Sequence, residues 1–524
     1  MNKIIFTIIF NSIFSVCSSV LAQAPPIQWA RCYGGSFQDY GRSVVQSVNG
    51  DYFVTGYTLS NDSQVSGLHS VGFPDYWVIR IDSIGNLLWQ KCLGGTSDEY
   101  AYSIDATSDG GCIVTGVALS HDGDVTGYFG NSDYWVIKLD SGGSIQWKHC
   151  YGGTSQDGAC SVKQTRDGGY IISGYAESGD GEVIGQHGVQ DYWLLKLDST
   201  GNIQWAKTYG GSSQEAALSV SQTFDSGYIL AGWSTSTDSD VTGNHGGRDC
   251  WIVKTDSVGT IQWENSFGST GNEEANAVIQ TQDSGYAFAG KTGSFNNGDV
   301  SGNHGGEDFW LVKLDAAGTL QWQKCLGGSS HDIAYSILQT SDKGYVVAGS
   351  TSSIDGDVTG LHSNGNATDF WLAKTDSAGS IQWEECLGGT GAEIAYDIHE
   401  NIDGSYILTG STNSTNGDVS GNHSIGFYDY WVVKLASPAP LNIVENRQQL
   451  NFYAYPNPAQ EKLFIISNEQ MQQIKITDAL GKILFSQPQQ NKEKEIDIHT
   501  LAKGIYFLQV QTENGNGVKQ IVNN

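Results

Sequence analysis

Methionine and proline are scarce in this sequence, with 2 and 8 residues among 524, whereas glycine (67), tryptophan (15) and tyrosine (25) are abundant. A chain so poor in methionine and so rich in glycine and aromatic residues does not have the composition of a helical enzyme. It has the composition of a turn-rich all-β protein with an aromatic core.

Long apolar runs are also missing, except at the N-terminus. Residues 1–22 contain one lysine, an apolar run and then small residues, which predicts a secretory signal peptide cleaved after Ala22. No other run approaches the roughly 20 apolar residues that cross a bilayer. We therefore expect an exported chain without a transmembrane segment.

Basic residues are few: 27 Lys and Arg stand against 56 Asp and Glu, for a net charge of −29. From Glu445 onward the sequence has eight acidic and eight basic residues, so the excess belongs to the part before it. Such a surface repels phosphate backbones, and we expect no nucleic-acid partner. An acidic exterior is compatible with cation binding or with high solubility outside the cell.

One tryptophan of an IQW-type phrase recurs every 58 to 61 residues, at Trp29, Trp89, Trp147, Trp205, Trp263, Trp322 and Trp383. Each repeat contains four strand-like segments, for example 159–165, 169–176, 191–198 and 202–210. Short glycine turns of the kind between the first two and between the last two join antiparallel neighbours. Four antiparallel strands per repeat predict the blades of a β-propeller.

The phase of the repeat predicts how the propeller closes. Residues 27–33 supply only a fourth strand, and the last repeat stops after its third strand at Leu435. The N-terminal strand can therefore complete the last blade. We expect residues 23–436 to form an all-β, seven-bladed propeller closed by its N-terminal strand.

Several residue types recur with the repeat, and their periodicity favours structural roles. We expect the two tryptophans of each repeat to pack between blades. An aspartate precedes the DYW-type tryptophan in every repeat and is expected to hold loop amides. A histidine recurs in six of the preceding loops, where hydrogen-bonded packing is favoured over a zinc site. The equivalent cysteines lie too far apart for disulfides, and no CxxC pattern is present.

Acidic residues alternate with other oxygen-bearing residues in the long loops of the repeats. Such a pattern resembles half of a calcium loop but lacks the distal Glu of an EF-hand. Two interpretations stay open: turns stabilised by Asx hydrogen bonds, or calcium binding. The candidate calcium ligands are Asp124, Asp240, Asp299, Asp357 and Asp418.

No catalytic or cofactor-binding set can be chosen from the sequence. The hairpins lack the Asp-box spacing of sialidases, and the five arginines of the repeat region share no common register. Departures from the repeat are the better functional pointers, because a scaffold alone should repeat. They include Phe73, Pro74, Tyr128, Phe129, Phe427 and Tyr428.

The order of phrases in each repeat (YGGTSQDGACSV, DGGYIISGYA, then DYWLLKLDSTGNIQW) resembles the bacterial extracytoplasmic, SBBP-type β-propeller repeat over residues 27–436. The resemblance implies the fold and an exported setting. It implies no activity, because that family has no general one.

After residue 436 the sequence changes character. Residues 437–450 contain prolines and predict a linker, and residues 451–524 show the short alternating strands of a small β-sandwich. The YPNPA and LAKGIYFLQV phrases in this tail resemble the type A C-terminal sorting domain of the type IX secretion system. The resemblance implies that the secretion machinery is a partner, with candidate sorting residues Tyr455, Pro456, Asn457, Pro458, Gly481, Lys482, Gly504 and Lys519.

Together these features predict a secreted or surface-attached propeller that works as a non-catalytic binding or adhesion module for an extracellular glycan or protein. Two alternatives remain at this stage. One is an enzyme acting on extracellular polysaccharide, a hydrolase or lyase. The other is a structural component of a surface layer.

Overall fold

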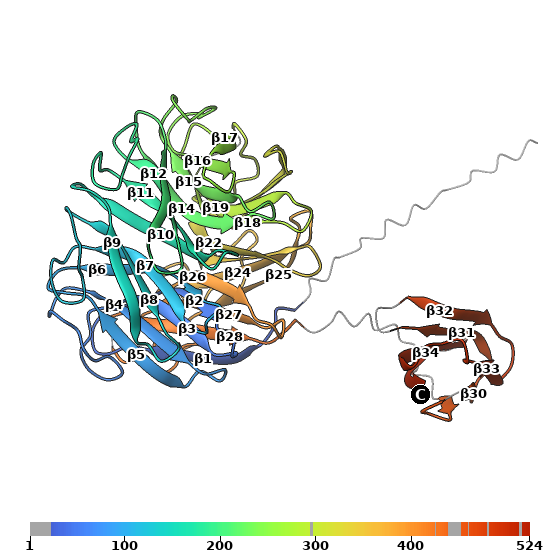
Figure 1. Ribbon diagram of the computed structural model, residues 1–524. Coiled ribbons are helices and arrows are strands. Elements are labelled where there is room, and N and C mark those ends of the chain that lie inside the picture. Colours follow the sequence, from blue (N-terminus) through green and yellow to red (C-terminus); the bar gives the residue numbers. More distant parts are fainter. Residues whose placement is uncertain are drawn as a thin grey trace, which may run out of the picture. The chain divides into compact units, whose positions relative to one another are not determined.

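The computed structural model describes residues 23–293, 297–424, 426–438, 452–459, 461–478, 482–512 and 516–523 (Figure 1). It divides into two compact units, one ending at Pro438 and the other beginning at Ala439. The expected signal peptide and nearly all of the expected linker lie outside the described residues. Within the described residues every regular element is a β-strand, so the all-β class is confirmed.

The first unit contains seven four-stranded antiparallel sheets. The strands of the first three are β2 (Asp39–Gln46), β3 (Tyr52–Thr58), β4 (Asp75–Ile81), β5 (Leu87–Leu93), β6 (Glu99–Ala106), β7 (Cys112–Ala118), β8 (Asp133–Leu139), β9 (Ile145–Tyr151), β10 (Asp157–Gln164), β11 (Tyr170–Ala176), β12 (Asp191–Leu197) and β13 (Ile203–Tyr209). The strands of the next three are β14 (Glu215–Gln222), β15 (Tyr228–Ser234), β16 (Asp249–Thr255), β17 (Ile261–Phe267), β18 (Glu273–Gln280), β19 (Tyr286–Thr292), β20 (Asp308–Leu314), β21 (Leu320–Leu326), β22 (Asp332–Gln339), β23 (Tyr345–Thr351), β24 (Asp369–Thr375) and β25 (Ile381–Leu387).

The seventh sheet joins the two ends of this unit. Its order is β1-β28-β27-β26, with β1 (Ile27–Tyr33) beside β28 (Asp429–Leu435), β27 (Tyr406–Thr412) and β26 (Glu393–Glu400). Tyr33 pairs with Tyr430 and Arg31 with Val432, so the strand pairing expected from the repeat phase is present.

Neighbouring sheets are linked by a recurring hydrogen bond. The Tyr76 hydroxyl donates to the carbonyl oxygen of Trp135 in the next sheet, at 3.2 Å. The same bond connects the last sheet to the first, where the Tyr430 hydroxyl donates to the carbonyl oxygen of Trp77 at 2.8 Å. The arrangement is propeller-like, with each sheet packed against its neighbours in chain order and β2 packed against β27.

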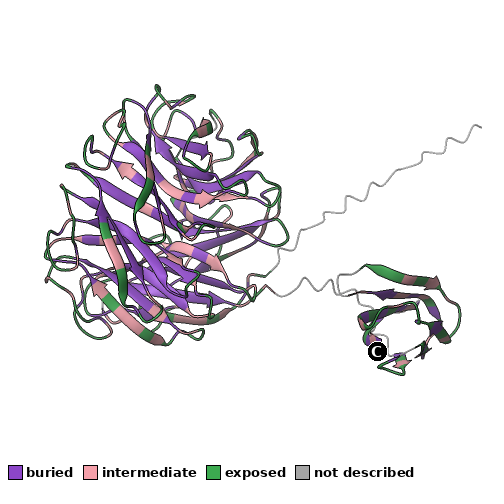
Figure 2. Cartoon of the chain, viewed as in Figure 1, coloured by how far each residue is buried: buried purple, intermediate pink, exposed green. Residues whose placement is uncertain are grey.

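Burial follows strand position within each sheet (Figure 2). Third strands such as β8 are buried along their whole length, because both faces are covered by neighbouring sheets. Their tryptophans, represented by Trp135, are fully buried, as expected. Fourth strands are outer edges, so tryptophans such as Trp147 are only half-buried. The Trp147 indole still links two repeats, donating to the Ser199 carbonyl at 3.2 Å.

The eight cysteines of the described chain are all free thiols, and six of them are buried. They act as small core side chains, for example Cys112 and Cys150 in one inter-sheet cluster.

The second unit holds a three-stranded sheet and a four-stranded sheet. Its strands are β29 (Phe452–Tyr455), β30 (Lys462–Ser467), β31 (Met471–Thr477), β32 (Ile483–Pro488), β33 (Glu493–Asp497), β34 (Gly504–Thr512) and β35 (Asn516–Asn523). Alternate residues of the two sheets, including Leu463, Ile474 and Leu508, form one buried core.

Candidate functional site

A central cavity of about 610 Å³ is the candidate site of the propeller-like unit, and residues from the first strand of every sheet line it. These strands are β2, β6, β10, β14, β18, β22 and β26. We call the cavity the central channel. Its size falls in the range of about 300–1,000 Å³ that is usual for ligand sites.

Serine side chains join neighbouring first strands around the channel. The register shifts in the middle of each first strand, as it does between Ala101 and Ser103 of β6. The Ser103 hydroxyl accepts a hydrogen bond from the Val162 amide of the next first strand at 3.1 Å. These bonds satisfy buried amides that no sheet ladder reaches, which makes the channel wall rigid.

An aromatic cluster, here called the aromatic arc, lies beside Arg42 of the channel lining. Tyr40 of β2 stacks on Tyr57 at 5.0 Å between ring centroids and on Tyr428 at 5.1 Å. Tyr57 in turn meets Tyr100 edge-on at 4.9 Å. The residues equivalent to Tyr40 and Tyr100 in β10, β14 and β18 are Gly158, Ala216 and Glu274. The aromatic arc is therefore formed by three adjacent repeats and is not reproduced in β10, β14 or β18.

Arg42 lies two residues further along β2 and faces the same channel. Its guanidinium carbon is 4.0 Å from the centroid of the Tyr396 ring and 5.8 Å from that of Tyr102. The Nη2 atom donates to the Tyr57 hydroxyl at 3.3 Å, and the buried Nε atom has no hydrogen-bond partner within the described part of the chain.

Ionisable groups also occur deeper in the channel. Lys163 Nζ is 3.9 Å from Asp105 Oδ1, and burial raises the pKa of Asp105. Burial lowers the pKa of His399 on the other side. The nearby Asp397 carboxylate accepts hydrogen bonds from the Ser43 hydroxyl at 2.8 Å, from a backbone amide of β2 and from a serine of β22. Asp397 is thereby held in a structural role.

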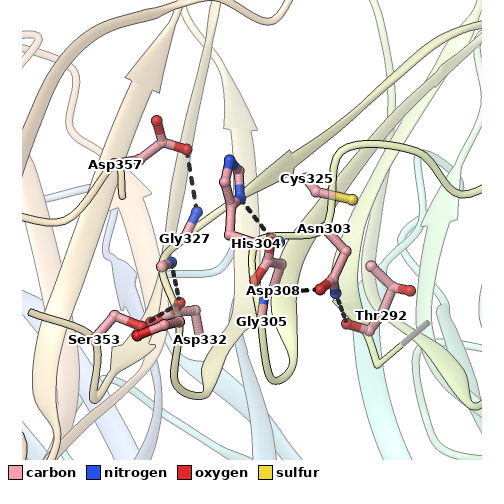
Figure 3. A network of polar contacts seen from close by, with 12 residues as sticks. Thr292, Asn303, His304, Gly305, Asp308, Cys325, Gly327, Asp332, Ser353 and Asp357 are labelled. Atoms are coloured by element: carbon pink, nitrogen blue, oxygen red, sulfur yellow. Dashed lines mark hydrogen bonds and ion pairs between the residues drawn. The ribbon is translucent and has the colours of Figure 1, made fainter. Parts of the chain in front are cut away.

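The recurring aspartates and histidines form a separate polar network beneath the long loops (Figure 3). Asp308 Oδ2 accepts from the His304 backbone amide at 2.9 Å and lies 2.8 Å from His304 Nδ1. Asp332 Oδ2, in the next repeat, accepts from the Gly328 amide and the Ser353 hydroxyl, both at 2.8 Å. The structural roles expected for the aspartate and histidine are confirmed.

Two carboxyl groups are thus buried where two neighbouring sheets meet. One comes from the first strand of a sheet, and the other comes from the third strand of the preceding sheet. Burial is the main cause that raises the pKa of Asp39, Glu99 and Asp133 to about 7. One carboxylate oxygen of every third-strand aspartate has no hydrogen-bond partner within the described residues, namely Oδ1 of Asp75, Asp133, Asp191, Asp249, Asp308, Asp369 and Asp429.

The candidate calcium ligands lie next to this network. Asp357 Oδ2 accepts from the Gly327 amide at 3.2 Å, and Asp240, Asp299 and Asp418 hold the equivalent amides in their repeats. Asp124 instead pairs with Lys148 at 3.2 Å. No group of three or more His, Cys, Asp or Glu side chains able to hold a metal ion occurs among the described residues. Calcium binding at these positions stays a prediction.

The loop departures picked out in the sequence fall into two kinds. Tyr428 belongs to the aromatic arc, and Phe427 packs beside Phe37 at 5.9 Å. Phe73 and Phe129 are exposed. Sequence reasoning missed Tyr40, Tyr57, Tyr100, Tyr102, Tyr396 and Arg42. An alignment of the seven first strands by column would have found most of them, because other residue types, such as Gly158, Leu218 and Asn276, fill the same columns in other repeats.

The candidate sorting residues are spread over both sheets of the second unit. Asn457 bridges to the last strand, accepting from the Val522 amide at 2.8 Å and donating to the Gln520 carbonyl at 2.9 Å. Tyr455 is exposed, and Lys519 Nζ lies 5.2 Å from the centroid of the Tyr453 ring. Pro456 and Pro458 follow cis peptide bonds, Lys482 and Gly504 begin or precede strands, and Gly481 lies outside the described residues.

Residues 453–524 match the family described as "Secretion system C-terminal sorting domain". The tail is thus a sorting domain of the type IX secretion system, which delivers proteins to a secreted or surface-attached state. The protein is an exported one, and the secretion machinery is its partner. No helix of the described residues is long and apolar enough to cross a membrane.

Other similarities are weaker. Regulatory protein FlaEY of Caulobacter vibrioides is 28% identical over 181 residues, and the match spans 32% of this chain and 19% of that protein. Among solved structures, Sqt1 from Chaetomium thermophilum has a TM-score of 0.41 at 9% identity, covering 79% of this chain and 100% of its own. The Neurospora crassa Pan2 WD40 domain has a TM-score of 0.43 at 9% identity, covering 78% and 92%.

Proposed function

We propose that this protein is an exported, non-catalytic binding module whose central channel holds an extracellular glycan. The observation that carries the proposal is the aromatic arc around Tyr40, which is present in only part of the repeat array. Scaffold residues repeat because every sheet has the same packing problem. Residues beside a cavity that differ between repeats are free to serve a ligand.

The proposal includes a closed, seven-bladed propeller. Three features support it: seven four-stranded sheets, the pairing of β1 with β28, and one cavity lined by all seven first strands. Closure gives the channel a continuous wall, so the chain presents one concave site in place of an extended open surface.

The shape of the site favours a glycan over a folded protein. A stable protein interface covers about 800 Å² on each partner and is spread over many residues. Here the aromatic residues are gathered beside one cavity of about 610 Å³, which suits a narrow chain. Tyrosine rings offer apolar edges to sugar C–H groups, and their hydroxyls exchange hydrogen bonds with sugar hydroxyls.

Binding of the full-length protein to a panel of extracellular glycans tests the proposal. We expect at least one glycan to bind, and we expect Tyr40→Ala combined with Tyr428→Ala to weaken that binding at least tenfold. Phe73→Ala is the matched control, because it removes an exposed aromatic ring of a long loop. Tyr40→Phe keeps the stacked ring and serves as a second control, because it allows the site to be tested if the alanine variant does not fold.

Two results would overturn the proposal. One is that no glycan of the panel binds to the folded protein. The other is that a bound glycan keeps its affinity in the double variant.

A further inference from the structure

Arg42 differs from the other arginines of the propeller-like unit in its acceptors. Arg31 and Arg166 donate to backbone carbonyls, Arg80 to Asp51 and a carbonyl, and Arg248 to Glu274. The recorded hydrogen bond of Arg42 goes to the neutral Tyr57 hydroxyl. In the described part of the chain, no carboxylate lies within 4.0 Å of its guanidinium.

Arg248 provides a direct comparison. Its guanidinium carbon lies 4.0 Å from the centroid of the Trp233 ring, the same distance that separates Arg42 from Tyr396. Arg248 also has a carboxylate partner in Glu274. Stacking on an aromatic ring is therefore common to both residues, and the absence of a counter-charge is peculiar to Arg42.

An unpaired cation in a channel is costly. Removing a charged group from water is unfavourable unless an opposite charge or a full set of hydrogen bonds replaces the lost solvation. A cation–π contact returns about 0.5–2 kcal/mol. Acidic residues are abundant in this chain, with 56 Asp and Glu. Among the described residues none of them forms an ion pair with Arg42. Arg42 lines the channel, and within the described residues its guanidinium makes one hydrogen bond, to the Tyr57 hydroxyl.

The geometry points to an acidic saccharide as the ligand, whose carboxylate or sulfate group is bound by Arg42. This inference rests on the proposed function and narrows its ligand class. A planar guanidinium can donate two parallel hydrogen bonds to either anion. Tyr396 lies under the guanidinium and fixes its plane. The bound anion would provide the negative charge beside Arg42 that no described residue of the protein provides.

Further groups in the channel wall suit the rest of the sugar. The hydroxyls of Tyr102, Tyr175 and Tyr335 line the channel and make no hydrogen bond recorded within the described residues. They are available to sugar hydroxyls. The acidic exterior repels long polyanions, so the preferred ligand carries its acidic group at a chain end that enters the channel.

Calorimetric titration of the full-length protein tests the inference with three matched oligosaccharides. One ends in glucuronate, one in 6-sulfoglucose and one in glucose. We expect the two acidic saccharides to bind at least tenfold more tightly than the neutral one. Arg42→Gln should abolish this preference, Arg42→Lys should retain part of it, and Arg248→Gln should leave it unchanged.

The outcomes are separable. Equal binding of the acidic and neutral saccharides, with no effect of Arg42→Gln, would overturn the anion site while the glycan-binding function stands. Binding of none of the three, together with a negative glycan panel, would overturn both. Preference for only glucuronate or only the sulfate would support the site and identify its anion. Arg42→Gln removes an unpaired cation. We therefore expect the melting temperature of this variant to be no lower than that of the parent protein. A loss of the preference for acidic saccharides would then not reflect unfolding.

Discussion

His423 Nδ1 lies 2.6 Å from Asp429 Oδ2, which ties the last long loop to the start of β28. The Asp429 hydrogen bond is the main cause that raises the pKa of His423 above 6.5. A histidine whose pKa is raised by folding stabilises the folded state fully below pH 6.5, and this contribution is lost as the pH rises through the folded pKa.

The buried carboxyls act in the same direction. Burial raises the pKa of Asp39 from its ordinary value of 3.8 to about 7 in the folded protein, so the folded state binds the proton more tightly. Stability conferred by such groups falls as the pH rises from about 4 to about 7. Burial raises the pKa of Asp109, but hydrogen bonds from Thr107, Lys138 and the Gly111 amide, together with the charge of Lys138, hold it at about 2, and their contribution to stability is lost on acidification.

We therefore predict that the protein is most stable near pH 5 and that its melting temperature falls by several degrees between pH 5 and pH 8. Thermal unfolding across this range measures the effect. His423→Asn should reduce the slope, whereas substitution of the exposed His331 should not. A melting temperature that rises from pH 5 to pH 8 would contradict the prediction.

The glycine that directly follows each fourth strand, such as Gly94 after β5, is expected to be irreplaceable. A Cβ atom on Gly94 would overlap Asp75 Oδ1 and would lie 2.6 Å from Glu99 Oε2. Both carboxyls are buried and cannot move aside. We therefore predict that Gly94→Ala lowers the free energy of unfolding by about 1–3 kcal/mol or more. Gly142→Ala is the matched control, since its Cβ meets only the Asp140 carboxylate, at 3.3 Å. Denaturant unfolding of both variants checks the prediction, and equal costs would refute it.

The proposed closure of the propeller can be tested by comparing two equivalent fourth strands. Ala30 and Arg31 of β1 pair with Val433 and Val432, and Ala206 and Lys207 of β13 occupy the same register in an internal sheet. Proline at either position removes a backbone donor.

We predict that Ala30→Pro and Arg31→Pro lower the melting temperature more than Ala206→Pro and Lys207→Pro. The pairing of β1 holds the two ends of the repeat array together, so its loss would free both ends. Strand β13 is connected through the chain to β12 and to β14, so its sheet stays in place when the pairing weakens. Equal losses in the two strands would show that closure contributes nothing to stability.

Calcium binding is tested by unfolding in chelator and in millimolar calcium. At Asp357 one carboxylate oxygen is already engaged by the Gly327 amide, so a cation would depend on the other oxygen, on backbone carbonyls and on water. We predict a weak site in the range of about 0.1–1 mM, typical of extracellular modules, and a rise of a few degrees in melting temperature. Asp357→Ala should remove part of the rise. An unchanged melting temperature would exclude calcium as a ligand of these loops.

Much of the fold could be read in the sequence because the repeat imposes it. Trp135 and its equivalents mark third strands that are covered on both faces, and the lone strand at 27–33 has a natural partner in 429–435. The half-exposure of Trp147 could not be read, because it depends on the fourth strand being an outer edge. Of the site, Tyr428 was recognised as a departure from the repeat, but its partner Tyr40 was not.

The sequence by itself determined the strand-rich repeats, the recurring aspartate, the histidine bonded to it in six repeats, and the sorting domain that exports the chain. Local alternation, turn chemistry and a fixed period are enough for these, because each repeat solves the same packing problem. Only the tertiary structure decided which departures from the repeat meet. Arg42 and Tyr396 lie at opposite ends of the repeat array in sequence, and they come within 4.0 Å because β2 packs beside β26 around a common cavity.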